Sequence, residues 1–215
     1  MKTVGRPTER GPQGPHQGVI MSLLARFQKA VAESISLKQQ FAATQGEAVV
    51  AAAQILAGVL KSGGKILLFG NGGSAADAQH LAAEFVNRLM VERPPLAALA
   101  LTTDTAILTA VANDYDFLQV FAKQVRALGR PGDLALGLST SGNSPNVVEG
   151  LKAARGLGLK TLALSGRDGG PVAAAAELAL IVPSWNTPRI QEVQITIGHV
   201  LCDLVDFILY PEKFG

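Results

Sequence analysis

The sequence has little cysteine, few aromatic residues and few charges. Its 215 residues include a single cysteine, Cys202, 5% aromatic residues and 17% charged residues. One cysteine excludes an intrachain disulfide and a cysteine-rich metal site. The low charge accompanies 48% hydrophobic residues, which supply a buried core and exclude a disordered chain. We expect a globular cytoplasmic protein, because no apolar signal segment follows the N-terminal charges and an unpaired cysteine suits a reducing compartment.

A long uncharged apolar run and a basic surface are also missing. The most apolar uncharged stretch, Ala48–Leu60, has 13 residues, whereas a bilayer-spanning helix needs about 20. The formal net charge is +2, and Lys2, Arg6 and Arg10 against Glu9 place all of it near the N-terminus. A neutral body with few aromatic residues offers neither a basic face nor a stacking surface. We therefore expect no membrane span and no nucleic-acid partner.

The chain divides into a short tail and one domain. Residues 1–20 are rich in glycine and proline and lack hydrophobic periodicity, so we predict a disordered tail there. Apolar residues recur at helical spacing over residues 21–44, and a second helical stretch covers residues 47–61. We predict one domain over residues 21–215 that begins with these two helices. The first has an apolar face outside the rest of the domain, which favours oligomerisation.

Apolar runs and helical segments alternate along the rest of the chain. We predict strands over residues 65–69, 96–102, 133–138, 160–164 and 178–182. We predict helices over residues 74–90, 105–112, 117–128, 145–155 and 189–209. Apolar strands separated by helices indicate a mainly parallel sheet covered on both faces. The fold class is therefore α/β, a doubly wound sheet flanked by helices, with ligands expected beyond the carboxyl ends of the strands.

Two loops that connect a predicted strand to a predicted helix suit a phosphate. The first, GNGGS at residues 70–74, brings backbone amides and a helix N-terminus toward a ligand, although a tight structural turn would look the same. The second, STSGNSP at residues 139–145, adds four hydroxyl groups to this arrangement. Because hydroxyls donate well to a phosphate monoester, we assign phosphate binding to the second loop. Asn113 and Asp114 are a weaker candidate for contacts to sugar hydroxyls.

Histidine and acidic side chains share faces of two predicted helices. His80 and Glu84 are four residues apart, so they can bind one metal ion or form an exposed pair. His199 lies on the last helix, four residues before Asp203, with which it could simply pair. Gln191 precedes His199 by eight residues, about 12 Å along a helix, which strains contact of both with one small ion. A site built across subunits would relieve this strain.

Four segments resemble motifs of the sugar isomerase (SIS) domain family: GNGGSAADAQHLAAE, LTTDTAILTAVANDYDF, STSGNSPNVV and RIQEVQITIGH. The similarity extends from about residue 21 to residue 209. Within the family it points to enzymes that convert sedoheptulose 7-phosphate into D-glycero-D-manno-heptose 7-phosphate for the heptose of lipopolysaccharide. It implies a cytoplasmic homotetramer with sites built across subunits, one zinc ion per site and a phosphorylated seven-carbon sugar as ligand.

The resemblance also implies roles for individual residues. The family's metal ligands correspond to His80, Glu84, Gln191 and His199. Its substrate contacts correspond to Asn71, Gly72, Gly73, Glu84, Asn113, Asp114, Ser139, Thr140, Ser141, Ser144 and Gln191. The sequence departs from the family pattern at Pro188, where an acidic residue can occur, and at Gln194, where many members have histidine. These departures affect the expected contacts to sugar hydroxyls more than the chemistry.

The expected reaction is an aldose–ketose isomerisation, which moves a proton between adjacent carbons and needs a base and an acid. We expect Glu84 to be the catalytic base. His199 would exchange protons with the sugar oxygens, and a divalent ion would polarise the carbonyl group. A carboxylate bound to a metal is a weaker base, so the two roles of Glu84 compete.

A different function, protein binding without catalysis, is compatible with the same fold. The DnaA initiator-associating protein resembles this sequence and works as a tetrameric protein-binding module. That protein lacks equivalents of Glu84 and His199, which this sequence has, so we favour the enzyme. We disfavour a transcription regulator that senses phosphorylated sugars, because the sequence shows no helix-turn-helix segment before the domain.

Overall fold

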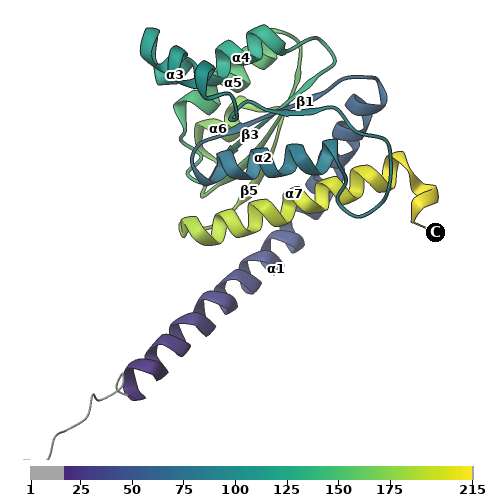
Figure 1. Cartoon of the computed structure of the whole chain (residues 1–215). Coiled ribbons are helices and arrows are strands. Elements are labelled where there is room, and N and C mark those ends of the chain that lie inside the picture. The colour runs from purple at the N-terminus through teal and green to yellow at the C-terminus, as the bar shows by residue number, and fades with distance from the viewer. Residues whose placement is uncertain (1–16, 215) are drawn as a thin grey trace, which may run out of the picture.

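A parallel five-stranded sheet forms the centre of the molecule (Figure 1). The computed structural model describes residues 17–214. The strands are β1 (Ile66–Gly70), β2 (Ala98–Ala100), β3 (Leu134–Ser139), β4 (Lys160–Gly166) and β5 (Leu178–Val182), in the order β2-β1-β3-β4-β5. The helices are α1 (Gln17–Lys61), α2 (Gly73–Val86), α3 (Thr105–Asp114), α4 (Val120–Leu128), α5 (Pro145–Gly156), α6 (Gly170–Ala175) and α7 (Thr187–Leu209), with short 3-10 turns at Phe117–Gln119 and Pro211–Lys213. The predicted doubly wound α/β fold is confirmed.

Alternate residues of the central strand β1 face opposite layers of helices. Ile66 and Leu68 pack with α1, α2 and α7 on one face of the sheet, whereas Leu67 and Phe69 pack with α4, α5 and α6 on the other. Every residue of β1 is buried. A strand covered on both faces has no polar side, which is why continuous apolar runs predict the strands of this fold.

The prediction of two helices before the first strand is wrong, because α1 is one helix of 45 residues, about 68 Å long. No proline occurs in it, and Gly46, near the expected break, does not adopt a positive φ. The helix therefore continues through this position. α1 also begins at Gln17, so residues 17–20 belong to it and not to the predicted tail. The rest of that tail, residues 1–16, lies outside the described residues.

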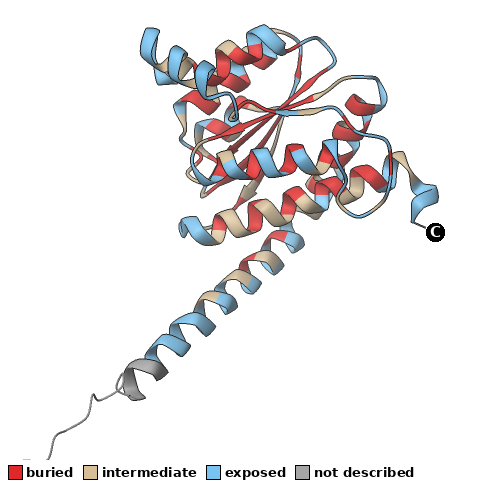
Figure 2. Cartoon of the chain, in the orientation of Figure 1, coloured by how far each residue is buried: buried red, intermediate tan, exposed pale blue. Residues whose placement is uncertain are grey.

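The two halves of α1 have different surroundings (Figure 2). From Leu37 onwards its apolar residues join the core, and Leu56 is fully buried. The preceding half projects from the body of the molecule, with Leu24, Phe27 and Ile35 exposed. These residues recur at helical spacing and form one apolar stripe. A contiguous apolar stripe on a projecting helix marks a surface that another molecule can cover.

By length and composition, the segment Ser22–Lys61 of α1 could cross a membrane, although the sequence has no uncharged run of that length. It is the one helix of the described residues that meets this criterion. Its second half packs into the protein core. This packing accounts for the apolar residues of the second half alone.

Some predicted elements differ from the observed ones at their ends. α2 ends at Val86, four residues before the predicted end. β2 has three residues, whereas seven were predicted, and it lies at the edge of the sheet, where it pairs only with β1. α6 was not expected, since its six residues are too few to show a helical period.

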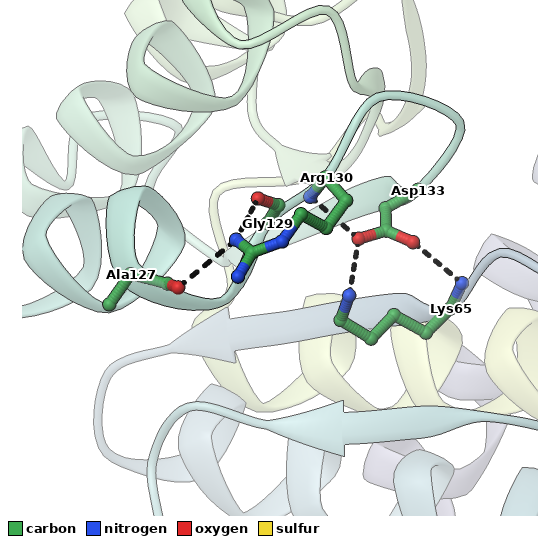
Figure 3. A network of polar contacts seen from close by, with 5 residues as sticks. All are labelled: Lys65, Ala127, Gly129, Arg130 and Asp133. Carbon is green, nitrogen blue, oxygen red and sulfur yellow. Dashed lines mark hydrogen bonds and ion pairs between the residues drawn. The ribbon is translucent and has the colours of Figure 1, made fainter.

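A buried carboxylate ties the starts of β1 and β3 together (Figure 3). The Asp133 carboxylate accepts hydrogen bonds from the Lys65 backbone amide at 3.0 Å, from the Lys65 ammonium group and from the Arg130 amide at 2.8 Å. Burial raises the pKa of Asp133, but the hydrogen bonds from Lys65 and Arg130 and the charge of Lys65 outweigh it and lower the pKa below 3.8. The ionised carboxylate therefore stabilises the fold.

We predict that Asp133→Asn lowers the free energy of unfolding at pH 7 by about 1.5–3 kcal/mol, because it weakens hydrogen bonds to a charged group. The folded-state pKa is lowered, so this stabilisation is complete above the unfolded pKa of about 4 and is lost as the pH falls through the folded value. Urea unfolding at pH 7 and below pH 4 measures both effects. Glu149→Gln, which removes an exposed pair with Lys152, is the control and should change little. An equal loss at both pH values would contradict the assignment.

Candidate active site

The carboxyl ends of β1 and β3 lie side by side where the strand order reverses. β1 leads outward to β2, and the chain then returns to place β3 on the other side of β1. Such a switch point forms the ligand crevice of open α/β sheets. The glycine loop (residues 70–74) follows β1, and the serine loop (residues 139–145) follows β3. The structure thus brings the two predicted ligand loops to one place.

A reciprocal amide pair joins these loops. Asn71 Nδ2 donates to Asn146 Oδ1 at 2.8 Å, and Asn146 Nδ2 donates to Asn71 Oδ1 at 2.9 Å. Asn146 is buried in the first turn of α5. Sequence motifs pointed to Asn71 as a substrate contact and missed Asn146, for which a polar residue directly after Pro145 was the available signal. The pair fixes the distance between the two loops.

The serine loop gathers three hydroxyl groups. Ser139 Oγ lies 2.9 Å from Ser144 Oγ and 3.4 Å from Ser141 Oγ. Ser144 is the N-cap residue of α5, yet its side chain does not cap the helix. The Ser144 hydroxyl is therefore directed to its serine neighbours. Gly142, with a φ of 71°, makes the turn that brings these hydroxyls together.

The glycine loop lets other groups approach its backbone closely. Gly72 is the N-cap residue of α2 and has a φ of 56°, a conformation that glycine adopts without strain. A Cβ atom on Gly73 would overlap the side-chain amide of Gln191. Gln191, near the start of α7, therefore lies directly against the first residue of α2.

His80 stands at the centre of a cluster formed by α2 and α7. His80 Nε2 lies 2.8 Å from His199 Nε2 and 3.6 Å from Glu84 Oε1. The imidazole rings meet edge to face, and at this distance only one of the two Nε2 atoms can carry a proton. The structure brings together three of the four predicted metal ligands and both predicted catalytic residues.

The donor set of this cluster suits zinc, which binds imidazole nitrogen and carboxylate oxygen. Two imidazoles on one tetrahedral zinc have nitrogens about 3.3 Å apart, given Zn–N bonds of about 2.0–2.1 Å. The separation of 2.8 Å between His80 Nε2 and His199 Nε2 is shorter than this value, so the two rings would have to move apart to bind one ion. Within residues 17–214, however, no three His, Cys, Asp or Glu side chains already stand in a metal-binding arrangement. Binding of one ion by three or more side chains thus requires Glu84 to rotate or another donor to approach.

Asp77 connects Gln191 to the histidines and was missed as a site residue. Its carboxyl accepts a hydrogen bond from Gln191 and lies close enough to His80 and His199 for a positive charge on either ring to stabilise the carboxylate. Burial raises the pKa of Asp77, and these partners lower it only in part. One oxygen, Oδ2, is buried without a hydrogen-bond partner. The spacing of three residues from Asp77 to His80 was the sequence signal for this role.

The two departures from the family pattern lie on α7 and serve the fold. Pro188 occupies the first turn of the helix, where it needs no backbone hydrogen bond. Gln194 is fully buried, and its Nε2 donates to the carbonyls of Leu164 at 3.1 Å and Ser139 at 3.4 Å. Gln194 therefore anchors α7 to the end of β4 and to the start of the serine loop.

Asn113 and Asp114 lie apart from the histidine cluster. They end α3, which packs in the helix layer opposite to α2 and α7. Both are exposed, and Asn113 Nδ2 donates to Asp114 Oδ1 at 2.8 Å. Their contact with a sugar stays a prediction.

Comparison with known proteins defines the class to which this fold and site belong. The chain matches the SIS domain family over residues 29–166 and belongs to that family. Its relatives make it an enzyme of the phosphosugar isomerase class. More distant structures share the fold alone, such as the sugar isomerase domain of a transcription factor from Sphaerobacter thermophilus, at 22% identity and a TM-score of 0.61.

Within that class the similar proteins are phosphoheptose isomerases. The chain is 55% identical over 184 residues to the phosphoheptose isomerase of Aquifex aeolicus, covering 86% of this chain and 96% of the relative. It is 57% identical to that of Nitratidesulfovibrio vulgaris, covering 83% and 86%. The solved structure of the enzyme from Neisseria gonorrhoeae is 51% identical, with a TM-score of 0.81 over 86% of this chain and 98% of that one.

We predict that Asn71→Ala and Asn146→Ala are non-additive. Each replacement breaks the same two hydrogen bonds and leaves the partner amide unpaired, so the double variant should lose less stability than the sum of the singles. The expected coupling is about 1–2 kcal/mol. Urea unfolding of the two single variants and the double variant measures it. Additive losses would show that the two side chains do not support each other.

Proposed function

We propose that this enzyme converts sedoheptulose 7-phosphate into D-glycero-D-manno-heptose 7-phosphate, for the heptose of lipopolysaccharide. The observation that carries the proposal is that Glu84 and His199, a carboxylate and an imidazole from different helices, both lie next to His80. A base and an acid at one point suit proton transfer between adjacent carbons. The names of the relatives add the heptose phosphate substrate.

The phosphate of the sugar binds at the serine loop in this proposal. Ser139, Ser141 and Ser144 direct their hydroxyls to one another at the N-terminus of α5, where the helix dipole favours an anion. Thr140 and the backbone of Gly72 and Gly73 complete the phosphate end. His80 lies seven residues beyond Gly73, about 10 Å along α2. This separation is comparable to an extended seven-carbon chain with its phosphate, so carbons 1 and 2 reach the histidine cluster.

The reaction passes through an enediol. Glu84 takes the proton from the carbon beside the carbonyl group and returns it to the neighbouring carbon. Its side chain is 18% exposed, so water can exchange the proton that it carries. His199 moves the proton between the two sugar oxygens. Asn71, Asn113, Asp114 and Gln191 are the proposed contacts for the sugar hydroxyls.

A divalent zinc ion is part of the proposal. His80, Glu84, Gln191 and His199 would hold it, and the unpartnered Oδ2 of Asp77 supplies a negative charge beside the histidines. When bound, such an ion polarises the carbonyl group of the sugar. Gln191 lies with Asp77 and Gly73 in the single chain, so its participation needs a movement or a neighbouring subunit.

The proposed assembly is a cytoplasmic homotetramer with sites built across subunits. The apolar stripe of α1 at Leu24, Phe27 and Ile35 supports it, since a stripe of this kind needs a cover. Buried, unpaired Cys202 is compatible with a reducing compartment. We predict a tetramer by light scattering at micromolar concentration and a smaller species for Phe27→Glu. A monomeric unmodified protein would refute the assembly.

We predict that Ser139→Ala combined with Ser141→Ala weakens binding of the sugar phosphate by at most about 6 kcal/mol. Each lost hydroxyl removes a hydrogen bond to a charged group, worth about 1.5–3 kcal/mol. Calorimetry with sedoheptulose 7-phosphate and with inorganic phosphate measures the loss. Ser184→Ala, in the loop before α7, is the control. Unchanged affinity would move the phosphate to the glycine loop.

We predict that Glu84→Gln and His199→Asn each reduce isomerisation by at least about 10²-fold, while both variants keep the fold. Glu84→Gln should also stop exchange of the carbon-bound proton with solvent, whereas His199→Asn should retain slow exchange because it acts on oxygen. Analysis of the sugar phosphates and proton NMR measure these two effects. Near-normal turnover of Glu84→Gln would remove the catalytic assignment and favour a protein-binding role for the fold.

A further inference from the structure

A buried ion pair joins the end of α2 to α7, away from the reacting groups. Arg93 follows α2 in the chain, and Asp206 lies two turns beyond His199 on α7. Arg93 Nε donates to Asp206 Oδ1 at 2.8 Å. Both side chains are almost completely buried, at 0% and 2% exposure. The bridge therefore connects the two helices that carry the histidine cluster.

The same guanidinium group also caps the end of α2. Arg93 Nη2 donates to the carbonyl of Glu84 at 2.9 Å. Arg93 Nη1 donates to the carbonyls of Phe85 at 2.7 Å and Asn87 at 3.1 Å. These carbonyls lie in the last turn of the helix or just beyond it, where several lack a partner inside the helix. One of them belongs to the backbone of Glu84, the proposed base.

A second contact shows how closely the two helices are matched. A Cβ atom on Gly198 would lie 2.5 Å from Leu81 Cδ2, so Leu81 fills the hollow that this glycine leaves on α7. Leu81 follows His80, and Gly198 precedes His199. The helices thus meet closely beside the cluster, and the Arg93 bridge holds them further along.

A contribution to stability is a weak explanation for burying this ion pair. Burying two charges costs several kcal/mol for each ion, and replacing a buried pair by apolar residues of similar volume is often neutral or stabilising. A planar guanidinium that binds a carboxylate and three backbone carbonyls, however, allows only one relative position of its partners. Arg93 therefore fixes the position of α2 on α7 more strictly than an apolar contact could.

We propose that Arg93, through Asp206, is a positioning residue that sets the separation of Glu84 and His80 from His199. The proposal rests on the proposed function, because it takes this cluster as the catalytic centre. A shift of α2 along α7 would separate the groups that must act on one sugar. A misplacement of about 1 Å in such a centre can cost about 10²-fold in rate.

The test compares Arg93→Lys with Asp133→Asn in the full-length protein. Lysine keeps the charge but cannot bind Asp206 and the α2 carbonyls together. Asp133→Asn removes a buried ionic partner at the amino ends of β1 and β3, far from the cluster. It therefore shows how much of any effect comes from lost stability alone. We expect Arg93→Lys to lower kcat by about 10–100-fold with KM changed by less than threefold, and to weaken binding of Co²⁺ measured by its visible spectrum. The control should keep kcat and the Co²⁺ spectrum.

A second variant removes the bridge without leaving a buried charge. Arg93→Met combined with Asp206→Leu retains apolar volume and should fold even if Arg93→Lys does not. Crystal structures of this variant and of the unmodified protein, both prepared without metal, should show His80 Nε2 and His199 Nε2 further apart in the variant. An unchanged separation, or kcat equal to the control, would overturn the positioning role. If the unmodified protein does not isomerise the heptose phosphate, the proposed function fails, and the crystal structure still decides the positioning role.

Discussion

The close packing of α2 against α7 is the constraint on which the active site depends. His80 and Glu84 come from one helix and His199 from the other, more than 100 residues later in the chain. Their meeting requires that the helices approach closely, which Gly198 permits by leaving room for Leu81. A larger residue at this position would force Leu81 to move from the place that it fills beside the histidines. A packing contact between two residues that take no part in the reaction thus helps to set the distance between the reacting side chains.

The sheet supplies the other half of the site. Because β1 and β3 are neighbours at the point where the strand order reverses, their loops share one crevice. The pair Asn71 and Asn146 fixes these loops to each other, and buried Gln194 links the serine loop to α7. These hydrogen bonds therefore connect the two loops to the helix that carries His199. In the proposed function, a sugar phosphate bound at the serine loop directs its far end along α2 to the histidine cluster.

Much of this arrangement could be predicted from the sequence, for physical reasons. Strands buried on both faces have continuous apolar runs, and Gly72, Ser144 and Pro145 mark the loops by their backbone requirements. Contacts between segments that are far apart in the chain produce no such local pattern in the sequence. Asn146 was missed as a site residue because its partner, Asn71, is 75 residues away. Asp77 was missed because its hydrogen-bond partner Gln191 lies on another helix, although His80 is only three residues away. The continuity of α1 was missed because the helical periodicity was interpreted as two stretches, residues 21–44 and 47–61. The roles of Arg93 and Asp206 appear only when α2 lies on α7.

The central claim is that this site moves a proton between carbons 1 and 2 of a heptose phosphate. Its most direct test is conversion of sedoheptulose 7-phosphate in D₂O, with proton NMR of the aldose product. The account predicts D-glycero-D-manno-heptose 7-phosphate with deuterium at carbon 2, because the base exchanges its proton with solvent. An aldose that retains protium at carbon 2 would contradict a base that exchanges its proton with solvent. Absence of any aldose would contradict the function itself.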